Sequence, residues 1–223
     1  MKICIPIVSK NKAEWLHDIQ QLQTIPYDLI EWRIDCMEQM SDIFSIAKEL
    51  RTYLSCPIIA TIRNEGTFCS LPWLSIYKEL ILMQCVDYVD VEILSDYEDI
   101  VLFAHQYNVQ VIGSVHNFNR SFTNFEWQEL YNKMKQANVD IYKFASMPQS
   151  NREVVDHLLM TYDIFCEDHV SIISICMGEI GKISRIVSGL FGSILTFGCF
   201  QKKSAPGQIE ATLLKSYLEA IDM

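Results

Sequence analysis

Lys143 is the first candidate for chemistry, because it lies inside the otherwise apolar run of residues 139–145. Burial alone disfavours an ammonium ion and lowers the pKa of a lysine from about 10.4 toward neutrality. A neutral amine is a nucleophile that can form a Schiff base with a carbonyl compound. The same pattern is also typical of a lysine whose stem packs on apolar surface while its charged end reaches water. This residue alone leaves both interpretations open.

An imidazole and several guanidinium groups come at or just after the ends of other apolar segments. They are His116 and three of the six arginines of the chain, Arg33, Arg63 and Arg185. Each has a structural explanation when taken alone, since a buried arginine can simply neutralise a nearby carboxylate. Together with an amine they form a set of groups suited to a small anionic substrate that carries a carbonyl.

The segment that ends with Arg33 also places acidic residues at alternate positions. With a period of two, Glu31, Arg33 and Asp35 share one face of a strand, while Trp32 and Ile34 take the other face. Alternating charge on a surface strand usually indicates a solvated face. In a strand that is buried on both sides, the charged face has no bulk water, and the same pattern favours an enclosed polar site.

These residues belong to a chain in which apolar, β-branched segments alternate with segments of helical period. The predicted strands are Ile3–Val8, Asp28–Ile34, Pro57–Ile62, Tyr88–Val91, Val109–Val115, Asp140–Ala145, Val170–Cys176 and Ser193–Phe197. The predicted helices lie near residues 11–23, 41–54, 71–84, 95–106, 124–137, 150–165, 180–190 and 208–221.

Eight such repeats predict a closed α/β barrel, the (β/α)8 or TIM barrel. The strand ends recur at intervals of about 20 to 35 residues, which suits βα units at the small end of the size range of this fold. An open doubly wound sheet is disfavoured, because no Gly-x-Gly-x-x-Gly motif follows a strand. In a barrel the reactive groups lie at the C-terminal ends of the strands, where Lys143, His116 and the arginines are expected.

The composition narrows the possible partners and cofactors. The chain has 223 residues, of which 50% are hydrophobic, and no linker-like stretch divides it, so residues 1–223 are predicted to form one domain. A net charge of −10 argues against nucleic acid or an anionic membrane as partner, and no apolar run is long enough to span a bilayer. Residues 1–8 are too short an apolar stretch for a secretory signal. The eight cysteines form no Cys-x-x-Cys pair, which predicts a reduced, cytoplasmic protein without a structural metal.

Six motifs, in order along nearly the whole chain, resemble those of type I 3-dehydroquinate dehydratases, the Schiff-base enzymes of the shikimate pathway. The motifs are Glu31-Trp32-Arg33-Ile34-Asp35, Thr61-Ile62-Arg63, Ser114-Val115-His116-Asn117-Phe118, Tyr142-Lys143-Phe144-Ala145-Ser146-Met147-Pro148, Met177-Gly178 through Ser184-Arg185, and Ser204-Ala205-Pro206-Gly207-Gln208. Each motif is a weak pattern by itself, whereas six of them in the right order and at barrel positions are a specific one.

The resemblance implies a (β/α)8 barrel, a homodimer, and a lyase that needs no cofactor or metal. It implies a role in aromatic amino acid biosynthesis, with quinate breakdown as the alternative that the sequence leaves open. It implies that Lys143 forms an imine with the C3 ketone of 3-dehydroquinate and that His116 removes the C2 proton as general base. Arg185 is expected to bind the substrate carboxylate with its two-pronged guanidinium group. The other residues expected to bind the substrate are Glu31, Arg33, Arg63, Met177, Ser204, Ala205 and Gln208.

The loop after Arg63 departs from the family pattern. Members of the family usually have three residues between this arginine and an acidic residue that orients the catalytic histidine, followed by two glycines. Here Glu65 is separated from Arg63 by one residue and is followed by the single glycine Gly66. We expect Glu65 to orient His116 across this shorter loop. If it cannot, turnover should fall, while imine formation at Lys143 should survive.

Two other functions are compatible with parts of the pattern. A different Schiff-base barrel, such as a class I aldolase, would share Lys143 but would not require the motif of residues 204–208 or an arginine after the seventh strand. A non-catalytic barrel that binds a cyclohexane carboxylate would not require both Lys143 and His116.

Overall fold

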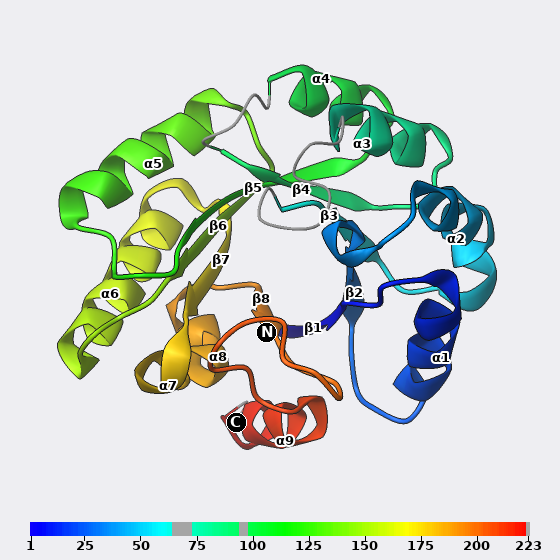
Figure 1. The fold of residues 1–223 in the computed structure, drawn as a ribbon. Helices are drawn as coiled ribbons and strands as arrows, with labels where there is room; N and C mark the ends of the chain where they lie inside the picture. Colours follow the sequence, from blue (N-terminus) through cyan, green and yellow to red (C-terminus); the bar gives the residue numbers. More distant parts are fainter. Residues whose placement is uncertain (64–72, 94–97, 222–223) are drawn as a thin grey trace.

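The computed structural model describes residues 1–63, 73–93 and 98–221, and within them eight parallel strands form a nearly closed barrel (Figure 1). The strands are β1 (Lys2–Ile7), β2 (Leu29–Arg33), β3 (Ile58–Thr61), β4 (Tyr88–Glu92), β5 (Gln110–Asn117), β6 (Ile141–Ser146), β7 (Ser171–Cys176) and β8 (Leu195–Phe197). Neighbouring strands pair in the order β7-β6-β5-β4-β3-β2-β1-β8. One isolated parallel bridge, between Ile172 and Ser193, connects the two ends of this order. The predicted barrel is confirmed.

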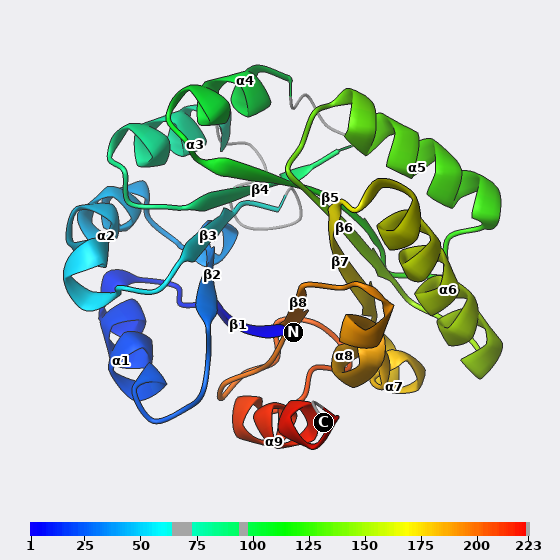
Figure 2. The same cartoon turned by 180° about the vertical axis from the view of Figure 1, so that it is seen from behind.

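Helices surround the strands on the outside of the ring (Figure 2). They are α1 (Lys12–Leu22), α2 (Met40–Tyr53), α3 (Trp73–Leu82), α4 (Glu98–Gln106), α5 (Asn124–Gln136), α6 (Asn151–Asp168), α7 (Gly178–Gly181), α8 (Ser184–Val187) and α9 (Ala211–Ile221). Two short 3-10 helices are η1 (Ile34–Cys36) and η2 (Ser188–Phe191). The N-terminus of α5 is capped by neighbouring residues. The Thr123 side chain accepts a hydrogen bond from the backbone NH of Glu126, and the Glu126 side chain accepts one from the backbone NH of Thr123, which forms a capping box.

The single helix predicted near residues 180–190 is wrong, because the structure divides this segment into α7, α8 and η2. The chain here packs directly against the end of β7. A Cβ on Gly181 would stand 2.6 Å from the carbonyl carbon of Cys176, and the Ser184 hydroxyl accepts a hydrogen bond from the Cys176 backbone NH. This close approach brings Arg185 to the mouth of the barrel, which a regular helix on the outside would not do.

The barrel interior is apolar in its lower layers and polar at the C-terminal ends of the strands. Alternate side chains point inward, and on β5 and β6 these are Ile112 and Ile141 below Ser114 and Lys143. The outward side chains pack against the helices in the main apolar core. The polar site therefore stands on an apolar floor, which fixes the strands beneath it.

The second strand is shorter than predicted. It ends at Arg33, and Asp35 lies in η1 rather than on the strand face that it was expected to share. The Arg33 guanidinium donates to both carboxylate oxygens of Asp35, at 2.9 and 2.6 Å, and this contact holds the turn that follows β2.

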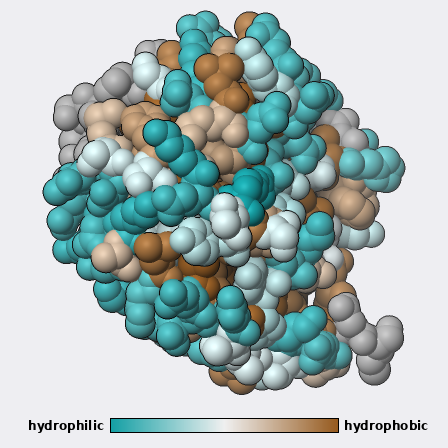
Figure 3. Space-filling view, turned by 90° about the vertical axis from the view of Figure 1, so that its right-hand side faces the viewer, coloured by the Kyte–Doolittle hydropathy of each residue, from teal (hydrophilic) through white to brown (hydrophobic). Residues whose placement is uncertain are grey.

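The outer surface is mixed in character. On the face at the right of Figure 1, hydrophilic side chains predominate, and hydrophobic ones lie in separate small groups (Figure 3). Within the described ranges, no helix combines the length and the hydrophobicity needed to cross a bilayer.

Candidate active site

A cavity of about 770 Å³ opens at the C-terminal ends of the strands. Ten of the eleven site residues predicted from the sequence line it: Glu31, Arg33, Arg63, His116, Lys143, Met177, Arg185, Ser204, Ala205 and Gln208. The eleventh, Glu65, lies outside the described residues. The barrel topology brings these side chains together from segments up to about 180 residues apart, as expected for a site at the C-terminal face.

Lys143 lies in the middle of β6 and is 3% exposed. Its Nζ is 2.7 Å from Oδ2 of Asp90 on β4 and 3.5 Å from Oε1 of Glu31 on β2. It also stands 4.5 Å from the centre of the Phe197 ring. The expectation of an amine in apolar surroundings is therefore corrected. Two carboxylates and an aromatic face surround the nitrogen, in place of the apolar environment that the sequence indicated.

Asp90 is fully buried and is shared between two cations. In addition to Lys143, the Arg63 guanidinium approaches its Oδ1 at 2.8 Å, and the Ser114 hydroxyl donates to Oδ1 at 2.6 Å. Burial by itself raises the pKa of Asp90, but Arg63 and Lys143 outweigh it and hold the pKa well below the ordinary value. Asp90 is thus ionised at neutral pH.

His116, at the end of β5, contacts a second carboxylate on β4. Its Nδ1 is 2.7 Å from Oε1 of Glu92, and its ring stacks on Phe118 with the ring centres 6.0 Å apart. Burial and the nearby Arg63 charge lower the pKa of His116, although Glu92 acts in the opposite direction. The imidazole is therefore neutral at pH 7. Since ionised Glu92 only accepts hydrogen bonds, Nδ1 carries the proton and Nε2 is the basic nitrogen.

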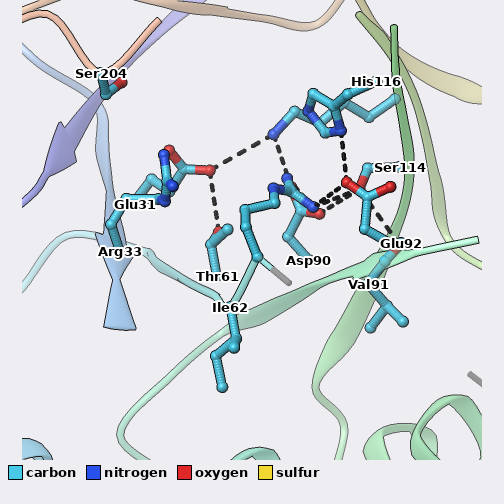
Figure 4. Close-up of polar contacts among 12 residues, drawn as sticks. Glu31, Arg33, Thr61, Ile62, Asp90, Val91, Glu92, Ser114, His116 and Ser204 are labelled. Atoms are coloured by element: carbon cyan, nitrogen blue, oxygen red, sulfur yellow. Dashed lines mark hydrogen bonds and ion pairs between the residues drawn. The ribbon is translucent and has the colours of Figure 1, made fainter. Parts of the chain in front are cut away.

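Arg63 connects the two carboxylates of β4 and also lines the cavity. That it binds the substrate stays a prediction. One terminal nitrogen is 2.8 Å from Asp90, and the other is 2.9 Å from both Glu92 and the Ser114 hydroxyl. Figure 4 shows Glu31 on one side and His116 with Glu92 on the other, with Asp90 between them. A continuous series of charge contacts therefore leads from the amine of Lys143 to the imidazole of His116.

Glu31 and Arg33 lie at the end of β2. One carboxylate oxygen of Glu31 accepts a hydrogen bond from the Thr61 hydroxyl at 3.0 Å and is the oxygen nearest Lys143. Arg33 pairs with Asp35 at the pocket wall. Both Glu31 and Asp35 are almost fully buried, and both line the cavity.

Arg185 has different surroundings from Arg63. It is 1% exposed, and its terminal nitrogens donate to the backbone carbonyls of Phe197 and Pro206, at 3.1 and 2.9 Å. Its buried Nε has no hydrogen-bond partner, and among the described residues no carboxylate lies within ion-pair distance of it. Burial lowers the pKa of Arg185 to about 10, so the group remains a cation at neutral pH. An anion in the cavity would satisfy this charge.

The last loop is held to Arg185 and to itself. Gln208 accepts hydrogen bonds from the backbone NH groups of Ser204 and Ala205 and donates to the Ser204 hydroxyl at 2.9 Å. Gly207 has a φ of +76°, and a Cβ there would collide with the backbone of Gly178. Only glycine allows this approach, and the approach closes the loop over the α7 side of the pocket.

The sequence interpretation missed the two carboxylates of β4, Asp90 and Glu92, as functional residues. A signal for them was present, because the segment Tyr88-Val89-Asp90-Val91-Glu92 alternates apolar and acidic residues as the segment that contains Glu31 and Arg33 does. The same period of two predicts that both carboxylates point into the barrel.

The described part of the chain contains no cluster of His, Cys, Asp and Glu side chains arranged to hold a metal ion. That the site needs no metal or organic cofactor stays a prediction.

Comparisons with known proteins cover nearly the whole length of the chain. Residues 3–223 match the family model for type I 3-dehydroquinase. A 3-dehydroquinate dehydratase of Clostridioides difficile is 34% identical over 233 residues, which cover 99% of this chain and 91% of that protein. One from Clostridium botulinum is 36% identical over the same length, with 99% and 92% covered.

Solved structures show the same fold. The crystal structure of 3-dehydroquinate dehydratase from Geobacillus kaustophilus has a TM-score of 0.93 at 26% identity and covers 99% of this chain and 90% of that one. The type I 3-dehydroquinate dehydratase from Clostridium difficile with covalently modified comenic acid has a TM-score of 0.90 at 33% identity, with 99% and 92% covered. The chain therefore belongs to the type I 3-dehydroquinase family.

Proposed function

We propose that Lys143 and His116 divide the chemistry of this pocket, Lys143 as the nucleophile and His116 as the general base. The overall activity is that of a type I 3-dehydroquinate dehydratase, a lyase of the shikimate pathway that acts through a Schiff base. The observation that carries the assignment is that the amine and the imidazole line one cavity and are connected through Asp90, Arg63 and Glu92.

In the first step the Nζ of Lys143 attacks the C3 ketone of 3-dehydroquinate, and loss of one water molecule leaves a protonated imine. The ammonium gives up a proton before the attack, this proton leaves with the ketone oxygen as part of the water molecule, and the imine carries the positive charge afterwards. Asp90 and Glu31 therefore face a cation both before and after the imine forms. Because their position favours a cation, the site stabilises the intermediate, which is charged, over an uncharged alternative.

In the second step the imine withdraws electrons and acidifies the C2 proton of the substrate. His116 accepts that proton at Nε2, and the electron pair moves toward the imine nitrogen. The protonated His116 then returns a proton to the C1 hydroxyl, which leaves as water. Hydrolysis of the imine releases 3-dehydroshikimate and restores Lys143. A base that is neutral at pH 7, as His116 is, suits this step.

The substrate carboxylate is assigned to Arg185, whose buried charge the described carboxylates leave uncompensated. Ser204 and Gln208 close the pocket beside it. Glu31 and Arg33 stand where they can bind the ring hydroxyls, while Met177 and Ala205 shape the wall. Arg63 lines the same cavity and is also proposed to bind a ring hydroxyl, while its contacts with Asp90 and Glu92 hold the carboxylates of β4 in place.

The alternatives are disfavoured by specific features. A class I aldolase does not require a buried arginine without a carboxylate partner beside the last loop. A non-catalytic barrel does not require a neutral imidazole oriented by a carboxylate in the same cavity as the amine. Both features are present here, as Arg185 and as His116 with Glu92.

We further propose that residues 1–223 act as one catalytic domain, in the cytoplasm, as a homodimer. The full-length match to the family supports the first point, and the homodimer is what the resemblance in sequence motifs implies. The seven cysteines among the described residues are all unpaired, which supports a reducing compartment. Analytical ultracentrifugation of the purified chain tests the dimer.

The His116→Ala variant tests the division of roles. The wild-type chain is expected to convert 3-dehydroquinate to 3-dehydroshikimate, and loss of the base should lower turnover by about 10²–10⁴-fold. The variant should still form the imine, which borohydride traps and mass spectrometry detects. Full turnover in His116→Ala would show that another group is the base.

A further inference from the structure

We propose that Glu92 is the positioning residue that orients His116, the role that the family pattern assigns to Glu65. The inference rests on the proposed function of His116 as general base and adds a residue that neither the sequence motifs nor the resemblance pointed to. Glu92 acts through His116 and does not itself contact the reacting atoms.

The geometry of the contact supports this role. The Oε1 atom of Glu92 is 2.7 Å from Nδ1 of His116, the length of a strong charge-assisted hydrogen bond. A carboxylate at this position accepts the Nδ1 proton, which fixes the tautomer and leaves Nε2 as the basic nitrogen. The Glu92 side chain is 23% exposed and that of His116 13%, so little water competes for the contact.

Glu92 is itself held on two sides. It belongs to β4, whose pairing with β5 places Glu92 beside Ser114, two residues before His116. One terminal nitrogen of Arg63 is 2.9 Å from the same Oε1 atom that contacts His116. A carboxylate on a strand and fixed by an arginine is positioned more tightly than one on a loop.

The two carboxylates of β4 have separate partners. Asp90 contacts the amine of Lys143, and Glu92 contacts the imidazole of His116, while Arg63 lies against both carboxylates. Because Asp90 already compensates Lys143, it is not available to orient His116. Glu92 is the carboxylate that the described structure places within hydrogen-bond distance of the ring.

The charges around His116 predict how a change at Glu92 acts. The ring faces Glu92, Arg63, Lys143 and, more distantly, Asp90, with Phe118 stacked on it. Burial, Arg63 and Lys143 lower the pKa of His116, whereas Glu92 raises it. Burial raises the pKa of Glu92 itself, but its contacts with His116 and Arg63 outweigh this and lower the pKa, so Glu92 is an anion at neutral pH.

The Glu92→Gln variant tests the proposal, because it keeps the size of the side chain and removes its charge. We expect kcat to fall by about 10²-fold or more with a much smaller change in KM, as when a catalytic histidine loses the partner that fixes its tautomer. The acid limb of the pH profile of kcat/KM should move to lower pH. Glu92→Asp, which keeps the charge on a shorter side chain, should recover part of kcat and most of the pH profile.

A second measurement does not depend on turnover. Nitrogen NMR of His116 should show the proton on Nδ1 in the wild-type chain, and Glu92→Gln should lower the imidazole pKa and mix the tautomers. Glu219→Gln, an exposed carboxylate paired with Lys215 on α9, makes the same charge change far from the site and is the matched control. Imine trapping by borohydride in Glu92→Gln separates a failure of this inference from a failure of the proposed function.

Two results would overturn the proposal. One is a Glu92→Gln variant with wild-type kcat, pH profile and His116 tautomer. The other is a Glu65→Gln variant that alone shows the loss of kcat and the change of tautomer, while Glu92→Gln shows neither.

Discussion

The two sides of the pocket satisfy their charges in opposite ways. On the side formed by β2 to β6, each cation has carboxylate partners: Lys143 contacts Asp90 and Glu31, and Arg63 contacts Asp90 and Glu92. On the side formed by β7, α8 and the last loop, the buried Arg185 has only backbone carbonyls as partners among the described residues.

This contrast indicates that the side formed by β2 to β6, called here the paired side, carries out the chemistry, while the Arg185 side recognises the substrate. The paired side is complete by itself and needs its internal contacts to hold the amine and the imidazole. The Arg185 side carries a buried positive charge that an anionic substrate would compensate. A change on the paired side should therefore weaken the fold and the chemistry together, and a change on the Arg185 side should mainly weaken binding.

The largest effect on the fold is expected from Asp90→Asn. The variant leaves Lys143 and Arg63 buried with less negative charge, which should lower the free energy of unfolding by about 3–5 kcal/mol. Urea unfolding at pH 7 measures it. Because folding lowers the pKa of Asp90, its contribution is fully present above the unfolded value of about 3.9 and is lost as the pH falls below it. The difference between wild type and variant should shrink in acid. If Asp90→Asn were as stable as the wild-type chain at pH 7, the paired side would not depend on its internal charge contacts, and the contrast with the Arg185 side would be wrong.

Arg185→Met tests the other side. Losing the guanidinium should cost about 2–5 kcal/mol of substrate binding, a rise in KM of at least roughly 30-fold. The free energy of unfolding should change much less than in Asp90→Asn, because the lost cation has no carboxylate partner among the described residues. Arg152→Met, a change at an exposed arginine on α6, is the control. A variant with unchanged KM and a large loss of stability would reverse the assignment of the two sides.

The pH profile of kcat/KM reports the pKa of His116 on the paired side. His116 acts as a base only when it is neutral, so activity rises with pH through the pKa of His116. Because burial and Arg63 lower that pKa, the acid limb should lie below the ordinary value of about 6.5. Steady-state kinetics between pH 4.5 and about 8 would locate it. A limb at or above 6.5 would mean that the carboxylates dominate over burial.

The smallest change in substrate binding is expected for Ser204, at the edge of the Arg185 side. Ser204→Ala removes one hydrogen bond to Gln208, which is worth about 0.5–1.5 kcal/mol. KM should rise by about 2- to 12-fold with kcat nearly unchanged. A fall in kcat without a change in KM would assign Ser204 to the chemistry instead of to closure of the loop.

The sequence predicted the barrel and most of the pocket for a physical reason. Apolar strands of regular spacing define the fold, and residues such as Lys143 and His116 at strand ends must converge once the barrel forms. The charge partners were harder to predict, because they depend on the register between strands. Pairing of β4 with β5 aligns Glu92 with Ser114 and Asp90 with Ile112, and no local pattern specifies these pairings.

The wrong helix prediction has the same origin. The segment after β7 was predicted as one helix because its apolar spacing is helical, but the close approach at Gly181 overrides that local preference. That Arg63 binds the substrate stays a prediction, whereas its contacts with Asp90 and Glu92 were not predicted, because these carboxylates come from another strand. The prediction for Glu65 lies outside the described residues.

The most direct test of the account is borohydride reduction of the wild-type chain in the presence of 3-dehydroquinate, followed by peptide mass spectrometry. We predict one stable adduct, on Lys143, that forms with 3-dehydroquinate and is absent without it. No adduct, or an adduct on a different lysine, would contradict the claim that the amine held by Asp90 and Glu31 is the nucleophile.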